Sequence, residues 1–311
     1  MFFLRGLAVS LALFVLSYCM LSLLVVCGWR FLLRVRDISP RMQAGTLIVV
    51  RLFPFALSLL GTLTLVVPSF VMLEPRAAEE EVGLVPVVLA LACLLVLVAN
   101  LARAIHAQAK TNQVFGAWLH DAHVLEVGVP ARAFKSRSQV PPLTVAGVCR
   151  PRLLFSEAAL SLLTEQELQA AVRHELAHIR FGDNLKKLAV KLAWFPGMAG
   201  IESAWHNAAE LAADDAAVAN ANQALDLASA LVKVLRHCKS QPLPAISMGF
   251  VSDGSVKSRI ERLLNWEETA PTGSRLYWLF SLLPIAAVAA IAFHYAGLLN
   301  QVHLLTEWLV R

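Results

Sequence analysis

Hydrophobic and polar positions are distributed unevenly along this chain. Four stretches of about 20 residues are almost entirely apolar, which is the length that a helix needs to cross the hydrocarbon core of a bilayer. They cover residues 6–29, 52–73, 84–101 and 276–299. The pattern predicts four membrane-spanning helices. We expect the first to be a retained anchor rather than a secretory signal, because its apolar run is long and no small-residue cleavage site follows it.

The section between the third and fourth apolar stretches has a mixed pattern. Residues of about 113–155 contain short β-leaning runs, AHVLEVGVP and LTVAGVC, separated by turn residues. From Ser156 to about Cys238 the apolar spacing is that of helices, QPLPAISMGFVSDG is expected to be a loop, and SVKSRIERLLNW a last helix. We therefore predict a mainly α protein with a soluble α+β domain inserted between spans three and four. The predicted parts are a three-span region 1–112, the inserted domain 113–272, and a last span with a short tail 273–311.

Composition and charge support a membrane protein and predict its orientation. The chain is 58% hydrophobic and 16% charged, whereas soluble domains carry near a quarter of charged residues. The loop after the first span is rich in arginine and the loop EPRAAEEE after the second is acidic, so the former and the inserted domain are expected on the cytoplasmic side. These flanking arginines account for the net charge of +5, and no basic stripe with interleaved aromatics predicts a nucleic-acid partner. The five cysteines form no CxxC pair, so no thiolate zinc site is expected.

The stretch TEQELQAAVRHELAHIRFGDN carries the candidate chemistry. Thr164 and the glutamate three residues later form a capping-box pattern, and Gly182 is a natural stop, so a helix over about 165–181 is predicted. His174 and His178 lie one turn apart on one face of this helix, with Glu175 beside them. Two imidazoles at this spacing can bind a metal ion while the adjacent carboxylate serves as a base. The alternative is a pair of ordinary helix histidines, and a third ligand would decide between the two.

The best third ligand lies in WHNAAELAADDAAVA, an alanine-rich helical pattern. Glu210 could bind the metal, while Asp214, four residues later on the same face, could accept the free ring N–H of a ligand histidine. The alternative is a solvated acidic face. His206, one turn before Glu210, is a candidate donor to the transition-state oxyanion or else an ordinary surface histidine. The strand LTVAGVC, just before the active helix, is a candidate exposed edge along which an extended substrate could pair.

VRHELAHIRFGDN and AAELAADDAAVA resemble the gluzincin domain of the BlaR/MecR family of integral-membrane zinc peptidases, and so do RPRLLFSEAAL and SVKSRIERLLN. The resemblance covers nearly the whole chain and is specific from about 140 to 265. It implies a gluzincin-like peptidase domain facing the cytoplasm of a bacterial cell membrane. It also implies Zn²⁺ bound by His174, His178 and Glu210, with Glu175 as base. The expected function is a regulatory membrane-bound zinc endopeptidase that cleaves a cytoplasmic protein, such as a transcriptional repressor, or itself.

Some features depart from that family or leave other functions open. Its receptors carry a penicillin-binding sensor domain after the last span, whereas only NQVHLLTEWLVR follows here, so direct antibiotic sensing is not expected. HtpX-like quality-control proteases of the membrane share the two motifs. A non-catalytic signalling scaffold with a structural zinc would need no base beside the first histidine, so Glu175 favours an enzyme. A transporter is the remaining class, and four spans with a soluble insert disfavour it. Asp183, which matches an aspartate of the family, is expected to be structural.

Overall fold

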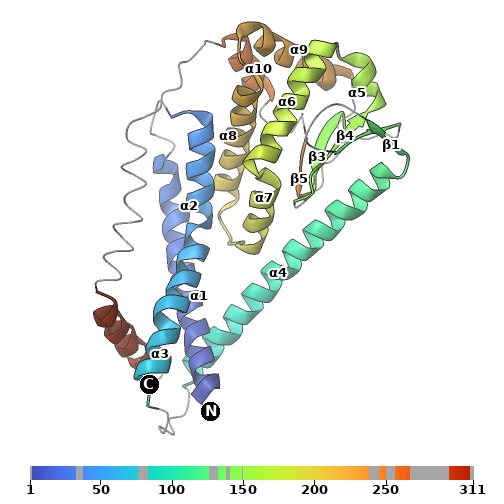
Figure 1. Cartoon of the computed structure of the whole chain (residues 1–311). Helices are drawn as coiled ribbons and strands as arrows, with labels where there is room; N and C mark the ends of the chain where they lie inside the picture. The colour runs from blue at the N-terminus through green and yellow to red at the C-terminus, as the bar shows by residue number, and fades with distance from the viewer. Residues whose placement is uncertain are drawn as a thin grey trace. The chain divides into compact units, whose positions relative to one another are not determined.

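The structure is a computed structural model of the chain (Figure 1). It describes residues 2–32, 38–75, 83–125, 132–137, 141–148, 150–237, 245–249, 256–266 and 294–308. The residues group into two compact units. One comprises Met1–Leu33, Val50–Asn100 and Pro271–Arg311, and the other comprises Arg34–Val49 and Leu101–Ala270. Each unit is considered by itself below.

The first unit is built from the long apolar helices. The helices with residues in it are α1 (Phe2–Leu32), α2 (Pro40–Gly61), a π-helical turn (Thr62–Val66), α3 (Val67–Leu73) and α4 (Leu84–Leu119). Three helical stretches are long and apolar enough to cross a membrane: Phe2–Phe31, Pro40–Leu73 and Leu84–Leu119. This confirms three of the four predicted spans. Residues 276–293 of the fourth lie outside the described residues, while residues 294–308 are helical.

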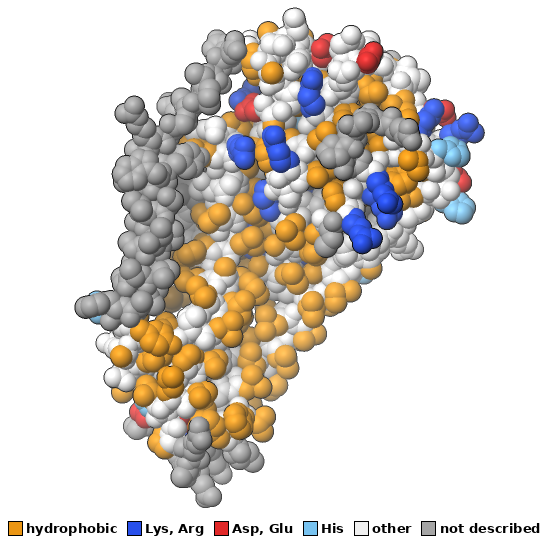
Figure 2. Space-filling model, viewed as in Figure 1, with side chains coloured by type: hydrophobic (Ala, Val, Ile, Leu, Met, Phe, Trp, Pro, Cys, Tyr) orange, Lys and Arg blue, Asp and Glu red, His pale blue; other side chains and the backbone are white. Residues whose placement is uncertain are grey.

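The surfaces of these long helices are strongly apolar. Leu24, Leu60, Leu91 and Leu95 are each more than half exposed, and hydrophobic side chains cover much of the visible surface of the helices in Figure 2. A soluble protein rarely exposes so large a continuous apolar surface, but a bilayer solvates it at no cost. The helices therefore form a membrane region.

The second unit contains one sheet of five strands: β1 (Ala122–Leu125), β2 (Arg132–Ser136), β3 (Leu143–Ala146), β4 (Arg152–Ser156) and β5 (Ser247–Gly249). Their spatial order is β1-β2-β4-β3-β5, with β2 and β4 parallel and the other neighbours antiparallel. Two expectations prove wrong here. Ser247–Gly249 is a strand rather than loop, and it pairs with β3. Because β4 holds the other side of β3, the predicted exposed edge at LTVAGVC is not free.

Among the described residues, the helices that follow β4 in this unit are α5 (Glu157–Leu162), α6 (Glu165–Phe181), α7 (Asp183–Leu192), α8 (Ala199–Ala217), α9 (Ala221–His237) and α10 (Val256–Leu264). This confirms the helical pattern from Ser156 onward and the last helix in SVKSRIERLLNW. The C-terminal part of α4 also belongs to the unit, and its Phe115 packs on Ala146 and Leu154 of the sheet. Helix α6 packs against β3, α7, α8 and α9, which makes it the centre of the unit.

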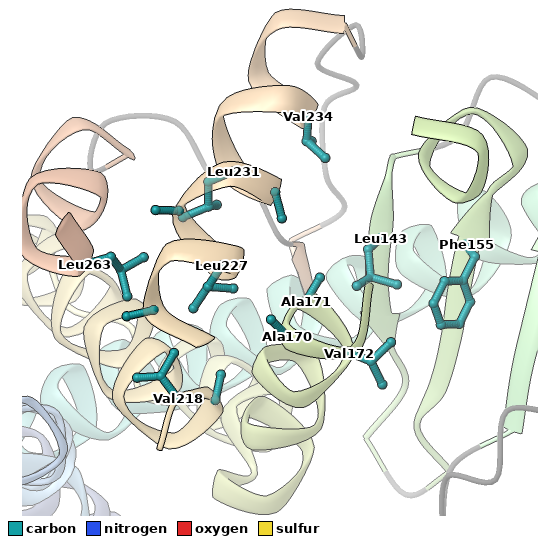
Figure 3. Packing of buried hydrophobic residues seen from close by; sticks show 14 of the residues in the cluster. Leu143, Phe155, Ala170, Ala171, Val172, Val218, Leu227, Leu231, Val234 and Leu263 are labelled. Carbon is teal, nitrogen blue, oxygen red and sulfur yellow. The ribbon is translucent and has the colours of Figure 1, made fainter. Parts of the chain in front are cut away.

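The hydrophobic core joins the sheet to these helices (Figure 3). Leu143 of β3 lies beside Ala171 of α6, Phe155 of β4 lies beyond Leu143, and Leu227 of α9 lies on the other side of Ala170. Alanine on α6 lets neighbouring backbones approach closely, so the helix is held on several sides. A side chain on α6 therefore projects from a rigid support.

Candidate metal centre

Helix α6 begins and ends as the sequence predicts. The Thr164 amide donates to the Glu167 carboxylate at 2.8 Å, and the Glu167 amide donates to the Thr164 hydroxyl at 3.3 Å, which completes the capping box. The Glu167 carboxylate also accepts from Ser229 at 2.6 Å and from Lys233 at 2.8 Å, both on α9. At the other end Gly182 has φ 68°, a left-handed conformation that glycine adopts without strain. These contacts fix the axial position of the helix.

The structure brings the three predicted ligands together. The Nε2 atoms of His174 and His178 lie 3.2 Å apart. From α8, Glu210 places one carboxylate oxygen 3.6 Å from Nε2 of His174 and the other 3.8 Å from Nε2 of His178. One potential ligand atom from each residue lies within 4.8 Å of the other two, and all three side chains are buried. Two helices far apart in sequence thus direct three ligands of the required kind to one point.

Each histidine has a carboxylate at its other ring nitrogen. Asp214 lies 2.9 Å from Nδ1 of His174, the position predicted for it, and Asp183 lies 2.8 Å from Nδ1 of His178. Such partners hold the Nδ1 proton and leave Nε2 as the ligand atom. From the sequence, Asp183 was expected to be structural only. Sequence periodicity does not predict its contact with His178, because the side chain reaches the histidine from beyond the Gly182 turn, where helical periodicity no longer gives directions.

An arginine not predicted for the site lies beside it. Arg259 of α10 is fully buried and forms a two-pronged contact with Asp214, at 2.7 and 2.8 Å, and a third bond to Glu210 at 2.8 Å. Burial opposes the charged form of Glu210, but Arg259, followed by His174 and His178, outweighs burial and lowers its pKa. Glu210 is therefore ionised, as a metal ligand must be. The only sequence signal for Arg259 was its place in the segment SVKSRIERLLN.

Glu175 is fully buried, and neither of its carboxylate oxygens has a hydrogen-bond partner among the described residues. Burial raises its pKa to about 8, against the opposing charge of His174. An unpartnered carboxylate in the interior is costly, and such a group marks a functional site more often than a structural one. A cation bound at the neighbouring ligands would favour the ionised form of Glu175, which has no hydrogen bond to a described residue to give up before it accepts a proton.

Two further basic groups lie near the site. Lys187 of α7 donates to the backbone carbonyl of Ser247 in β5, and burial lowers its pKa to about 8 although Glu210 and Asp183 oppose that change. The rings of His206 and Trp205 are tilted by 45° with their centroids 4.6 Å apart, and burial, followed by the charge of Lys187, lowers the pKa of His206 to about 4. His206 is thus neutral at physiological pH.

The donor set fits a transition-metal ion. Two imidazole nitrogens and one carboxylate are the ligands of a catalytic zinc site. Here the two Nε2 atoms face each other at 3.2 Å, and the oxygens of Glu210 lie 3.6 Å and 3.8 Å from them. Burial raises the free energy of these charges unless something compensates them. A divalent cation bound between the three ligands would do so.

Comparison with known families agrees with this geometry. A family model described as BlaR1 peptidase M56 matches residues 80–263, more than half of the chain. The chain belongs to the BlaR1 peptidase M56 family. No curated protein matches it closely. Family membership, the three candidate spans and the His-His-Glu cluster together identify a membrane-associated metallopeptidase. For this M56 peptidase the matched region includes α6, α8 and most of α10, the three helices that build the site.

Proposed function

We propose that this M56 peptidase is a zinc-dependent endopeptidase, with His174, His178 and Glu210 as ligands and Glu175 as general base. The observation that carries the proposal is the buried Glu175 carboxylate, without a partner among the described residues and adjacent to a ready set of ligands. A structural zinc site has no use for such a group. Zn²⁺ bound there supplies a Lewis acid that polarises a peptide carbonyl and lowers the pKa of water.

The side chains divide the remaining work. Glu175 accepts a proton from the attacking water and passes it to the leaving amine. Asp214 and Asp183 keep both imidazoles oriented through their Nδ1 atoms. Arg259 holds Glu210 and Asp214 in their ionised forms. His206, which is neutral and lies one turn before Glu210, is the candidate donor to the transition-state oxyanion.

The biological role follows from orientation and family. We propose that the peptidase unit faces the cytoplasm of a bacterial cell and cleaves a cytoplasmic protein. The arginine-rich loop after the first span supports this orientation. We propose a regulatory cleavage, of a transcriptional repressor or of the chain itself. Membership of the M56 family favours this role over quality control of the HtpX type.

The test compares the full chain in detergent with its Glu175→Gln variant, each incubated with a proteome-derived peptide library and analysed by mass spectrometry. We expect the parent to generate internal cleavages and the variant to be slower by about 10²–10⁴-fold with its zinc retained. Cleavage by Glu175→Gln at the parent rate would remove Glu175 from the mechanism. A parent that binds zinc and cuts nothing in the library would support the non-catalytic scaffold instead.

A further inference from the structure

One cavity of the peptidase unit lies away from the metal centre. It has a volume of about 970 Å³ and lies along another face of α6. Five residues of α6 line it: Arg173, Leu176, Ala177, Ile179 and Arg180. All but Ile179 have the spacing of a single helical face. His174 directly follows Arg173, and His178 directly follows Ala177. Each residue of a helix is rotated by about 100° from the one before it, so the metal face lies about 100° around α6 from the cavity. The cavity is therefore a separate feature of the same helix.

Arginines surround this cavity. Arg173 and Arg180 come from α6, Arg132 and Arg152 from the first residues of the parallel strands β2 and β4, and Arg150 from the turn before β4. No acidic residue lines the cavity among the described residues, and none of the five arginines forms an ion pair with a described residue. The Nε atom of Arg173 is buried and has no hydrogen-bond partner among the residues that the structure describes. Five like charges around one hollow repel one another and attract an anion.

Acidic groups on neighbouring elements do not neutralise this charge. Asp215 of α8 adjoins the lining residue Ala216, but its carboxylate accepts from Arg262 at 2.7 and 3.1 Å. Glu157, which directly follows β4, pairs with Lys135 at 2.9 Å. These described acids therefore do not neutralise the positive charge of the cavity, and an anionic ligand would do so.

A second cavity of about 570 Å³ shares Arg150 and Arg152 with the first. Its other walls come from α4 and α7 and include Phe115, Leu119 and the amide side chain of Gln108. The Oε1 atom of Gln108 is buried, and no described residue donates a hydrogen bond to it, so an acceptor is available there. The two cavities share Arg150 and Arg152 in their walls, and each also has apolar wall residues. We call the two cavities together the arginine groove.

We propose that the arginine groove binds an extended polypeptide segment with acidic residues at its centre and apolar residues on either side. Guanidinium groups bind carboxylates through paired hydrogen bonds, which suits Arg150 and Arg152 at the middle. The apolar walls, Leu176 and Ile179 at one end and Phe115 at the other, suit hydrophobic side chains. Gln108 can accept from a peptide N–H, which an acyl chain could not supply.

A groove for acidic segments deepens the proposed function by naming a substrate class. As a recruitment site for the peptidase it rests on that function, and the segment would be bound outside the metal centre. Its own existence does not depend on catalysis. A binding experiment with the Glu175→Gln chain therefore tests the groove alone, and failure there leaves the cleavage experiment unaffected.

The experiment measures fluorescence anisotropy of a labelled peptide with a glutamate block flanked by leucines, added to full-length Glu175→Gln protein in phosphatidylcholine nanodiscs. We expect saturable binding that weakens with salt, and much weaker binding of the peptide with glutamine in place of glutamate. Adding Arg150→Ala and Arg152→Ala together should reduce affinity about tenfold or more. A matched pair of exposed arginines outside the groove, Arg137→Ala and Arg236→Ala, should leave affinity unchanged.

Three outcomes would overturn the proposal. One is equal binding of the glutamate and glutamine peptides, and another is an equal effect of the two arginine pairs. The third concerns lipid. If phosphatidylglycerol nanodiscs abolish peptide binding, and Arg150→Ala with Arg152→Ala abolishes a preference of the protein for phosphatidylglycerol, the groove binds a lipid headgroup rather than a polypeptide.

Discussion

Two faces of helix α6 differ in how their charged side chains are paired. On the metal face, His174 and His178 each have a carboxylate at Nδ1, and Arg259 bonds to two acids at 2.7–2.8 Å. One residue away around the helix, Arg173 and Arg180 line a cavity and pair with no carboxylate among the described residues. The charges of the metal face are paired within the chain, whereas the arginines of the other face have no carboxylate partner among the described residues. One rigid helix thus carries two faces with different charge pairing.

The largest effect should come from the buried arginine of the metal face. Replacing Arg259 by methionine leaves Glu210 and Asp214 buried without their cation, which should lower the free energy of unfolding by about 3–5 kcal/mol. Arg173→Met is the matched change on the groove face and should cost less than about 1 kcal/mol, because no ion pair is lost. The measurement is the unfolding of both variants in detergent. Equal destabilisation would mean that the two faces do not differ in this way.

The next effect concerns the carboxylates behind the histidines. Asp214→Asn and Asp183→Asn should each weaken metal binding by about 10–100-fold, because the imidazoles lose the acceptors that orient them. Asp215→Asn is the control, since Asp215 lies on the same helix but pairs with Arg262. Competition with a chelator measures the affinities. If Asp215→Asn weakened metal binding as much as Asp214→Asn, the orienting role would be wrong.

A smaller effect is expected from Glu167, in the capping box at the N-terminus of α6. Burial disfavours ionised Glu167, but hydrogen bonds from Lys233, Ser229 and the Thr164 amide prevail and lower its pKa. Its contribution to stability is therefore present above pH 4.5 and is lost as the pH falls through the lowered value. Glu167→Gln should lose about 1–2 kcal/mol near neutral pH, and less on acidification. A difference from the parent that stays constant down to acidic pH would contradict this.

The smallest effect should come from the end of α6. Gly182 has φ 68°, and an added Cβ there would meet nothing within 4 Å, so Gly182→Ala should cost only backbone strain of about 1 kcal/mol. Gly182→Asn should cost less, because asparagine tolerates this conformation. Thermal unfolding of the two variants makes the comparison. A large loss of stability in both variants would indicate that the turn at Gly182 does more than position Asp183.

The sequence predicted those features that depend on local rules. Helical periodicity and capping chemistry were enough to predict the ends of α6 and the shared face of His174 and His178. They also predicted Glu210 with Asp214 four residues later. Arg259 could not be found this way, because its contact with Asp214 joins residues 45 apart. The pairing of β5 with β3 was missed for the same reason, since a three-residue strand within a turn-rich stretch has no periodicity to detect.

The most direct test of the whole account is the metal itself. Full-length Glu175→Gln protein, purified in detergent, should bind one zinc ion per chain. X-ray absorption should show two imidazole nitrogens and oxygen ligands near 2 Å, the usual distances for zinc. His178→Ala should lose this signal. If the protein binds no transition metal, or if His178→Ala and Glu210→Gln bind zinc as the parent does, then the cluster of His174, His178 and Glu210 is not the metal centre of this M56 peptidase.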